Sequence, residues 1–493
     1  MSRIETPEWV ADAIFYQIFP DRFAKSDRVP KPSNLEPWEG TCTHHGFKGG
    51  DLLGVVEHLD YLQDLGVTAI YFNPVFASTA NHRYHTHDYY QVDPILGGNE
   101  ALRTLLDEAH RRDMRIVLDG VFNHASRSFF QFSHIVENGP ESPYLDWFTT
   151  RSFPLRPYHA PPGQHGYESW WNLPALPTFN VSTPAVRRFL WDVAAYWIEF
   201  GIDGWRLDVP AEIDDDTFWQ EFRRRVKDTN PEAYIVGEIW GQAKRWLQGD
   251  QFDAVMNYLF ARACLGFFVG DNLLQEEVAR CGYHHIDLLD AEAFATTIRE
   301  TLALYPRQVN QVQLNLLSSH DTPRFKTLAR DDTSAYRLAT LFQMTYPGAP
   351  CIYYGDEIGL TGTHDPGCRA GFPWDEATWD QGLRDDVRRY ARLRHAHPAL
   401  RRGDFAWLFA GQGIVVYLRR LDDKGLVVAI NSSQHPIMLD VPVKEYLDDG
   451  VRLRAVDPPG DPASDLVVAQ GRINGLWVPT RSGTILEIVG SGE

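Results

Sequence analysis

Short apolar runs alternate with amphipathic segments along most of this chain. The runs are apolar on both faces, which is typical of parallel strands covered from both sides. Most of them end in polar or charged residues. We therefore predict eight parallel strands, at residues 13–23, 67–73, 115–123, 201–209, 233–240, 252–258, 313–321 and 349–355.

Helical periodicity separates nearly all of these strands. In the clearest helix, 182–200, either Ser182 or Thr183 is placed to cap the first turn. Pro184 suits that turn, and Gly201 ends the helix. The other helices are predicted at 51–65, 99–112, 214–228, 291–305, 333–346 and 384–397. This alternation predicts an α/β fold, a (β/α)8 TIM barrel.

Two segments interrupt the alternation. Residues 125–179 are rich in Pro, Gly and aromatic residues and are too long for a simple loop, so we predict a small inserted domain after the third strand. From residue 403 to 493 the pattern changes to short alternating strands with turn signals, which predicts a C-terminal antiparallel β-sandwich domain. The barrel is then formed by 1–124 and 180–402.

The strand at 201–209 carries charges where a buried strand should be apolar. Alternation places Arg206 and Asp208 on one face, whereas Trp205 and Leu207 lie on the other. A buried charge must be paired or used, and a neighbouring cation lowers the pKa of a carboxyl group. Taken alone, this pair is more typical of a structural ion pair than of a functional site.

Other strand ends carry acids as well. Glu238 ends the strand at 233–240, and His320 and Asp321 end the strand at 313–321. Catalytic residues of a barrel come from the C-terminal ends of several strands. Converging acids indicate either a Mg²⁺ or Ca²⁺ site or a glycoside hydrolase with a nucleophile and an acid/base. We favour the hydrolase, because Arg206 beside Asp208 would repel a cation.

The composition limits which kinds of partner and which cellular compartment we expect. The formal net charge of −19 argues against nucleic acid or an anionic membrane as the partner. No stretch of about 18 apolar residues is present. The five cysteines are scattered without a Cys-x-x-Cys pair, and the first ten residues have no apolar core of a signal peptide. We expect a cytoplasmic protein of unknown oligomeric state.

Four motifs at the strand ends resemble, in order, the signature regions of the α-amylase family of glycoside hydrolases (glycoside hydrolase family 13), and a fifth lies at the end of the insertion. The motifs are Asp119-Gly-Val-Phe-Asn-His124, Leu176-Pro-Thr-Phe-Asn180, Gly204-Trp-Arg-Leu-Asp208, Gly237-Glu-Ile-Trp240 and Ser319-His-Asp321. Within that family the chain most resembles neopullulanases, cyclomaltodextrinases and maltogenic amylases, through the segments 81–94, 249–258, 354–359 and 365–369. The predicted barrel begins almost at residue 1, so we expect no N-terminal β module of the kind that these proteins carry.

The resemblance implies roles for the acids. Asp208 matches the nucleophile that forms a covalent glycosyl-enzyme, and Glu238 matches the general acid/base, with a raised pKa. Asp321 matches the third acid, which holds sugar hydroxyls. Arg206 is expected to keep the pKa of Asp208 low, and retention of configuration should follow.

The resemblance also implies a set of substrate-binding residues. His82, His124 and His320 match histidines that bind the sugar at the cleavage point, and Tyr84 matches the tyrosine that stacks beneath it. Further sugar contacts are expected from Arg206, Glu212, Trp240, Asp365 and Arg369, whereas Asp119 and Asn123 are expected to orient Arg206 and the loop.

Two candidate metal sites compete with this interpretation. His82, His85 and His87 have zinc-like spacing, but we favour the sugar site, because it already uses His82. Relatives bind Ca²⁺ after the first strand, where the possible oxygen ligands here are Asp27, Asn34, Gly49 and Asp51. Because Lys25 lies in this loop, we expect no metal and no required cofactor.

The sequence therefore predicts a retaining α-glucan hydrolase that acts on maltodextrins, cyclodextrins or pullulan. It is expected to cleave α-1,4 bonds, and cleavage of α-1,6 bonds is left open. An alternative on the same scaffold is a glucosyltransferase or isomerase, such as a trehalose- or sucrose-active relative. A different class is a non-catalytic binding protein, which the presence of all three acids disfavours.

Overall fold

A computed structural model describes residues 4–161, 163–458 and 465–491. Eight parallel strands form the first sheet, in the order β8-β7-β6-β5-β2-β1-β10-β9. Met256, which follows β8, and Leu314 of β9 form a parallel bridge that closes the sheet into a barrel. The strands are β1 (Phe15–Ile18), β2 (Ala69–Phe72), β5 (Arg115–Gly120), β6 (Gly204–Leu207), β7 (Tyr234–Gly237), β8 (Ala254–Val255), β9 (Leu314–Leu316) and β10 (Ala349–Tyr353).

Every predicted strand is therefore present and buried. The helices surround the barrel: α3 (Leu52–Glu57), α4 (Leu59–Asp64), α5 (Gly98–His110), α7 (Pro184–Phe200), α8 (Asp216–Thr229), α9 (Tyr258–Cys264), α11 (Ala291–Ala303), α14 (Thr333–Thr345) and α15 (Gln381–Ala396). Gly201 ends α7 with a φ of 116°, as predicted. The predicted cap is wrong in detail, since the Thr183 hydroxyl donates to the carbonyl of Asp146 and not to its own helix.

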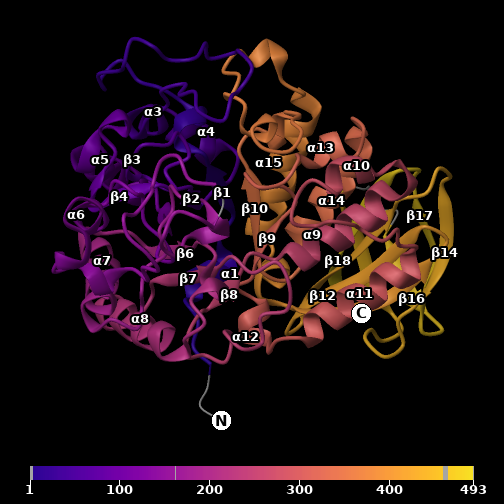
Figure 1. The fold of residues 1–493 in the computed structure, drawn as a ribbon. Coiled ribbons are helices and arrows are strands. Elements are labelled where there is room, and N and C mark those ends of the chain that lie inside the picture. The colour runs from indigo at the N-terminus through magenta and orange to yellow at the C-terminus, as the bar shows by residue number, and fades with distance from the viewer. Residues whose placement is uncertain (1–3, 162, 459–464, 492–493) are drawn as a thin grey trace.

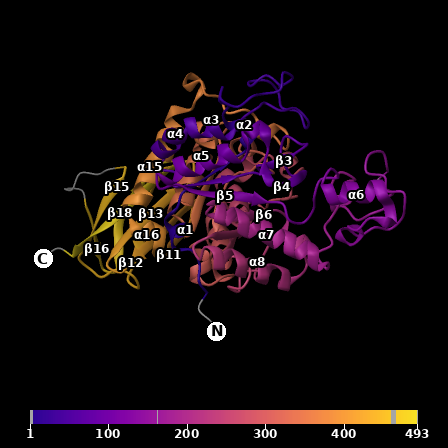
Figure 2. The same ribbon diagram turned by 90° about the vertical axis from the view of Figure 1, so that its left-hand side faces the viewer.

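Two segments extend from the barrel between its strands and helices. After β2, the hairpin β3 (Phe76–Ser78) and β4 (Thr86–Val92) carries His82 and Tyr84 in its connection. After β5, the insertion contains α6 (Phe130–Asn138) and projects from the side of the barrel (Figure 2). The bridge His124↔Thr178 ties its end to the end of the barrel strand segment, and the bridge Phe148↔Phe179 joins two parts of the insertion itself.

The C-terminal part is an eight-stranded antiparallel sheet, in the order β11-β12-β13-β18-β15-β16-β17-β14. Its strands are β11 (Asp404–Gly411), β12 (Ile414–Leu421), β13 (Lys424–Asn431), β14 (Ile437–Pro442), β15 (Val451–Asp457), β16 (Leu466–Ala469), β17 (Arg472–Val478) and β18 (Ser482–Ser491). The sheet folds over a small apolar core of its own and packs beside α11 and α14 (Figure 1).

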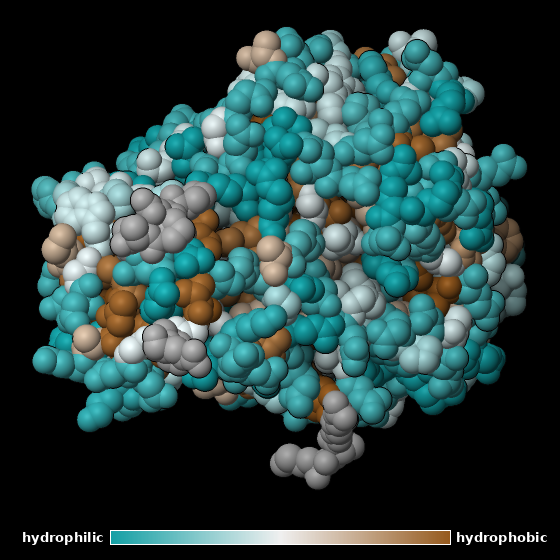
Figure 3. All heavy atoms as spheres, turned by 180° about the vertical axis from the view of Figure 1, so that it is seen from behind, coloured by the Kyte–Doolittle hydropathy of each residue, from teal (hydrophilic) through white to brown (hydrophobic). Residues whose placement is uncertain are grey.

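Most of the surface seen from behind is hydrophilic, and hydrophobic patches gather over the C-terminal sheet (Figure 3). Met438 and Trp477, a cross-strand pair of β14 and β17, are 66% and 49% exposed. No helix within the described residues is both long and apolar enough to cross a membrane.

Candidate active site

The predicted acids meet at the C-terminal end of the barrel. Asp208 directly follows β6, Glu238 directly follows β7, and Asp321 lies in the turn after β9. The side chains of Asp208 and Glu238 are almost fully buried, whereas that of Asp321 is 30% exposed. The strand pattern places the first two here, because a buried parallel strand ends where its backbone leaves the sheet at the barrel mouth.

Arg206 lies at the centre of this cluster and is fully buried. Its Nη1 donates to both carboxylate oxygens of Asp119, at 2.8 and 2.9 Å, and to Oδ1 of Asp208 at 3.1 Å. Its Nη2 lies 3.0 Å from Oε2 of Glu238. Asp119 and Arg206 are register partners on β5 and β6, so they face the barrel interior side by side. One cation thus links three carboxylates on neighbouring strand ends.

The charge balance differs from the sequence-based expectation for Asp208. Burial raises its pKa well above the usual carboxyl range, and the neighbouring Glu238 adds to this, whereas Arg206 opposes it. Arg206 has the predicted sign of effect, but burial outweighs it, because the cation is shared with Asp119 and Glu238. The sequence motif of Arg206 and Asp208 did not reveal how strongly burial would raise the pKa of Asp208.

Asp321 titrates near neutrality. Its pKa is raised to about 7, first by burial and then by the neighbouring Glu238, whereas Arg369 opposes the rise. Arg369 places Nη2 3.2 Å from Asp321 and Nη1 2.9 Å from Asp365, and its Nε donates to the carbonyl of His320. The predicted pair Asp365 and Arg369 is therefore joined directly to the third acid.

Two donors hold the carboxylate of Glu238. The indole Nε1 of Trp240 donates to Oε1 at 3.1 Å, and the backbone N–H of Val209 donates to Oε2 at 3.2 Å. Val209 has a φ of 37°, which is strained for a β-branched residue and is consistent with a functional site. Trp240 is itself fixed by stacking on Tyr258, with ring centroids 3.7 Å apart.

The rings of Tyr84 and His320 stack on each other beside Asp119 and Asp321. Their centroids are 5.6 Å apart, and the Tyr84 hydroxyl donates to Asp119 at 2.8 Å. The amide nitrogen of Gln17 lies 2.9 Å from Nδ1 of His320 and must be the donor. Nε2 of His320 then carries the hydrogen, 3.0 Å from Asp321.

The predicted histidines are neutral at pH 7. Burial lowers the pKa of His82 and His320 well below the usual range and that of His124 to about 3. His85, which we did not predict as a site residue, is similar, since burial lowers its pKa to about 4 and its ring centroid is 5.0 Å from that of His82. Neutral imidazoles suit hydroxyl groups as partners.

Sequence reasoning missed a supporting set of polar residues. Gln17 of β1 donates to Asn73 after β2, and Asn73 donates to the hydroxyls of Tyr71 and Tyr84. The signal was present, because Gln17 and Asn73 are polar residues in or just after apolar strands. Glu212 is not brought to the cluster; it is exposed in the short turn Pro210–Glu212.

The predicted calcium donors do not converge on a cation site. Asp27 and Asn34 are exposed, whereas Asp51 is buried and accepts from the backbone of Ser26 and Gly54. The ammonium of Lys31 lies 2.9 Å from Oδ2 of Asp51, where a metal ion would have to bind. These residues therefore do not fit a calcium ion.

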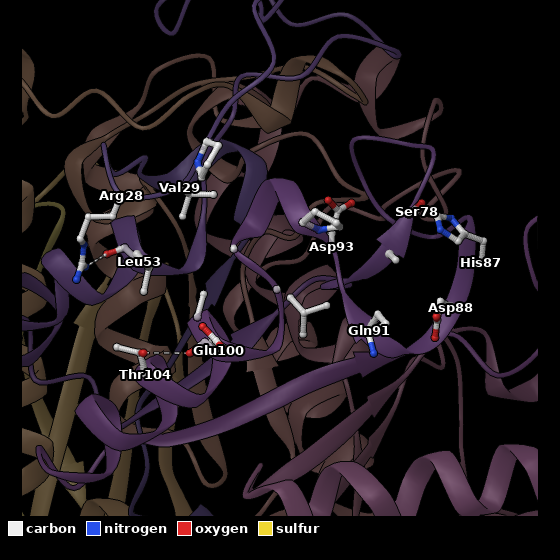
Figure 4. A pocket seen from close by; sticks show the side chains of 17 residues that line it. Arg28, Val29, Leu53, Ser78, His87, Asp88, Gln91, Asp93, Glu100 and Thr104 are labelled. Atoms are coloured by element: carbon white, nitrogen blue, oxygen red, sulfur yellow. Dashed lines mark hydrogen bonds between the residues drawn. The ribbon is translucent and has the colours of Figure 1, made fainter.

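A cavity of about 710 Å³ lies away from the acids, between α3, α5 and the β3–β4 hairpin (Figure 4). His87 lines this cavity (Figure 4), and among the described residues no three His, Cys, Asp or Glu side chains are grouped so that they could hold a metal ion. The zinc-like spacing therefore does not bring the three histidines together. The lining residues include no Trp, Tyr or Phe and none of the catalytic candidates. We therefore do not regard this cavity as the substrate site.

A family model described as the α-amylase catalytic domain matches residues 17–407. Among characterised proteins, a cyclomaltodextrinase of Bacillus sp is 47% identical over 87% of this chain and 74% of its own length. Neopullulanase 2 of Thermoactinomyces vulgaris is 44% identical over 90% of this chain and 74% of its own length.

Solved structures give the same picture over nearly the whole chain. The Ttha1563 protein of Thermus thermophilus is 49% identical, with a TM-score of 0.92, covering 98% of this chain and 100% of that one. The debranching enzyme of Nostoc punctiforme, soaked with acarbose, is 46% identical, with a TM-score of 0.86 and the same coverage.

Proposed function

The chain belongs to the α-amylase family of glycoside hydrolases, and from this premise we propose that it is a retaining hydrolase of α-glucosidic bonds in maltodextrins, cyclodextrins or pullulan. The observation that supports this most directly is Arg206, which links Asp208 and Glu238 at the ends of adjacent strands. A nucleophile and an acid/base held on one cation are what a double displacement needs.

In the proposed reaction Asp208 acts in its ionised form, which Arg206 favours against the effect of burial. Its carboxylate oxygen attacks the anomeric carbon while Glu238 gives its proton to the departing glycosidic oxygen. The bond between sugar and Asp208 is then broken by a water whose proton returns to Glu238. Two inversions retain the configuration. Trp240 and the N–H of Val209 would hold Glu238 in place, and Asp321 with the neutral His320 would bind sugar hydroxyls.

The test is Asp208→Asn, assayed on cyclodextrin, pullulan and starch. We expect a loss of at least about 10³-fold in kcat, since an amide cannot form the glycosyl-enzyme. Full activity of the variant on any of the three substrates would contradict the proposal. The transferase or isomerase alternative is not favoured, because the matched relatives are named as hydrolases.

We also propose a cytoplasmic location. The support is an intracellular maltogenic amylase of Bacillus subtilis that is 39% identical over 87% of this chain. Fractionation of the source cells, followed by an antibody against this chain, tests it. Recovery of the protein outside the cells would contradict the proposal.

A further inference from the structure

Four polar side chains beside the candidate acids form a closed ring of hydrogen bonds: Gln17, Asn73, Tyr84 and His320. The amide nitrogen of Gln17 lies 3.0 Å from Oδ1 of Asn73 and 2.9 Å from Nδ1 of His320. The Tyr84 hydroxyl completes the ring, 3.0 Å from Nδ2 of Asn73 and 2.6 Å from Nε2 of His320. Gln17, Asn73 and His320 are almost fully buried, so their polar atoms depend on one another for hydrogen bonds.

Asp119 fixes the direction of these hydrogen bonds. The hydroxyls of Tyr71 and Tyr84 both donate to Oδ2 of Asp119, at 3.0 and 2.8 Å. A phenol has a single hydrogen, so each hydroxyl oxygen can only accept from its other neighbours. Asn73 must therefore turn its amide nitrogen toward Tyr84, and His320 must carry a hydrogen on Nε2.

The same constraint determines the orientation of Gln17. Because the nitrogen of Asn73 faces Tyr84, its Oδ1 faces Gln17, which must donate to it through the amide nitrogen. The second hydrogen of that nitrogen then points at Nδ1 of His320, which must be the unprotonated nitrogen of a neutral ring. This orientation leaves Oε1 of Gln17 buried without a hydrogen-bond partner among the described residues, which is unfavourable. The fold thus keeps the nitrogen of Gln17 on His320 although its oxygen is unpaired.

We propose that Gln17 is a positioning residue for the hydrolysis, which holds His320 as the neutral tautomer with the hydrogen on Nε2. This nitrogen lies 3.0 Å from Oδ2 of Asp321. A sugar hydroxyl that binds both groups accepts from Nε2 and donates to the carboxylate, because the reversed tautomer offers it no hydrogen. Since Gln17 is fully buried, it acts through His320 and not on the substrate. This inference rests on the proposed hydrolase function.

The first test is spectroscopic and does not depend on activity. Protein labelled with 15N-histidine shows by chemical shift which ring nitrogens carry a hydrogen, and the signals that disappear in His320→Gln identify this ring among the 18 histidines. We expect Nδ1 of His320 to be unprotonated in the wild type at pH 7. In Gln17→Glu a carboxylate replaces the donor that faces Nδ1, so Nδ1 should carry a hydrogen. A hydrogen on Nδ1 in the wild type would overturn the proposal.

The second test compares two substitutions of Gln17 by kcat/KM on cyclodextrin. Gln17→Met keeps the length of the side chain but removes the donor, and we expect a loss of about tenfold. Gln17→Glu keeps the shape but reverses the hydrogen bond to His320, so its loss should be larger, about 10²-fold. If Gln17 served packing alone, the glutamate of nearly equal shape would be the milder change, and this order would overturn the proposal.

The matched control is Gln343→Met. Gln343 of α14 is a buried glutamine whose amide nitrogen also donates twice, to the carbonyls of Asn315 and Cys351. This variant should lower the Tm but keep the wild-type kcat/KM and the wild-type signals of His320. Wild-type kcat/KM in a folded Gln17→Met would overturn the positioning role alone. A wild-type protein that cleaves no α-glucan would refute the proposed function and the positioning role with it, whereas the signals of His320 would still decide its tautomer.

Discussion

Arg206 acts at the residue scale as the shared partner of three acids. Asp119 accepts two hydrogen bonds from it, so Arg206 is oriented by a residue that itself is fixed by the hydroxyls of Tyr71 and Tyr84. The guanidinium presents several donors in one plane, which lets it bridge strands that a single ammonium group cannot. Its charge therefore reaches both proposed catalytic groups.

Arg206→Lys should separate this role from packing. A lysine cannot hold all three carboxylates, so its contact with Asp208 weakens and the pKa of Asp208 rises further. We expect kcat to fall about 10²-fold or more and the acidic limb of the pH profile to move to higher pH. The measurement is kcat/KM on cyclodextrin across a pH series.

Arg419→Lys is the matched control, since Arg419 is a fully buried arginine that donates to backbone carbonyls, including that of Gly403. It should lower the Tm and leave the acidic limb in place. A limb that stays fixed in Arg206→Lys as well would mean that Arg206 serves packing only.

The raised pKa of Asp321 leads us to expect that the folded protein loses stability as pH rises. Its pKa is raised from 3.8 to about 7 in the folded protein. Between these values the unfolded chain is ionised while the folded chain keeps the proton, so stability falls as pH rises and is level above pH 7. Asp321→Asn removes this loss. The variant should match the wild-type Tm near pH 4 and exceed it by a few degrees at pH 8.

Thermal unfolding of both proteins across this pH range measures the difference. A difference that does not change with pH would show that the carboxyl group is not the cause. Activity is expected to be lost in the same variant, because the acid binds sugar hydroxyls in the proposed mechanism.

At the scale of elements, the sequence located all eight barrel strands because both of their faces are buried, which leaves a strong apolar pattern. The sequence pattern was less informative where contacts between distant parts of the chain determine where a helix is interrupted. The predicted helix 51–65 is broken at His58, whose ring packs at a tilt against Trp374 with centroids 3.6 Å apart. Such a contact joins residues far apart in the chain and leaves no local signal.

The candidate site shows the same division. The positions of Asp208 and Glu238 followed from the strand ends, whereas the contacts of Gln17 and Asn73 could be seen only in the fold. A search for polar residues within every apolar strand would have found Gln17.

The contacts of the loop between β1 and α3 predict that the stability of the protein does not depend on calcium. Lys31 binds both Asp51 at 2.9 Å and the carbonyl of Ile95 at 2.7 Å, which fixes the loop to the short turn Pro94–Leu96 that precedes α5. We expect millimolar EDTA or CaCl₂ to leave the Tm unchanged. Lys31→Met should lower stability by about 3 kcal/mol, because it leaves the buried Asp51 without its cation. Calorimetry with and without chelator measures both effects.

Lys25→Met serves as the control, since Lys25 is exposed in the same loop and lies over the ring of Trp38. Its Tm should change by little. A wild-type Tm that rises with added calcium would show that the loop binds the ion in spite of Lys31.

At the scale of the whole molecule, the barrel and the C-terminal sheet share one core. The main apolar cluster includes C-terminal residues that pack with the barrel helices: Val415, Tyr417, Leu426, Val428, Ile430 and Ile485. The hydroxyl of Tyr417 lies 2.5 Å from that of Thr345 at the end of α14. Strand alternation predicted the sheet but not which of its faces the barrel covers. One unfolding transition is therefore expected for both parts.

Gly483 of β18 gives the sharpest test of this shared core. A Cβ atom at this position would lie 2.1 Å from Cδ2 of Leu341 on α14, and Leu341 is buried. Gly483→Ala should cost about 1–3 kcal/mol by overpacking, and Leu341→Ala about 2–5 kcal/mol by leaving a cavity. In the double variant the new methyl group enters the space that Leu341 vacates, so its loss of Tm should be smaller than the sum of the two single losses. Additive losses would mean that the two parts do not pack as described.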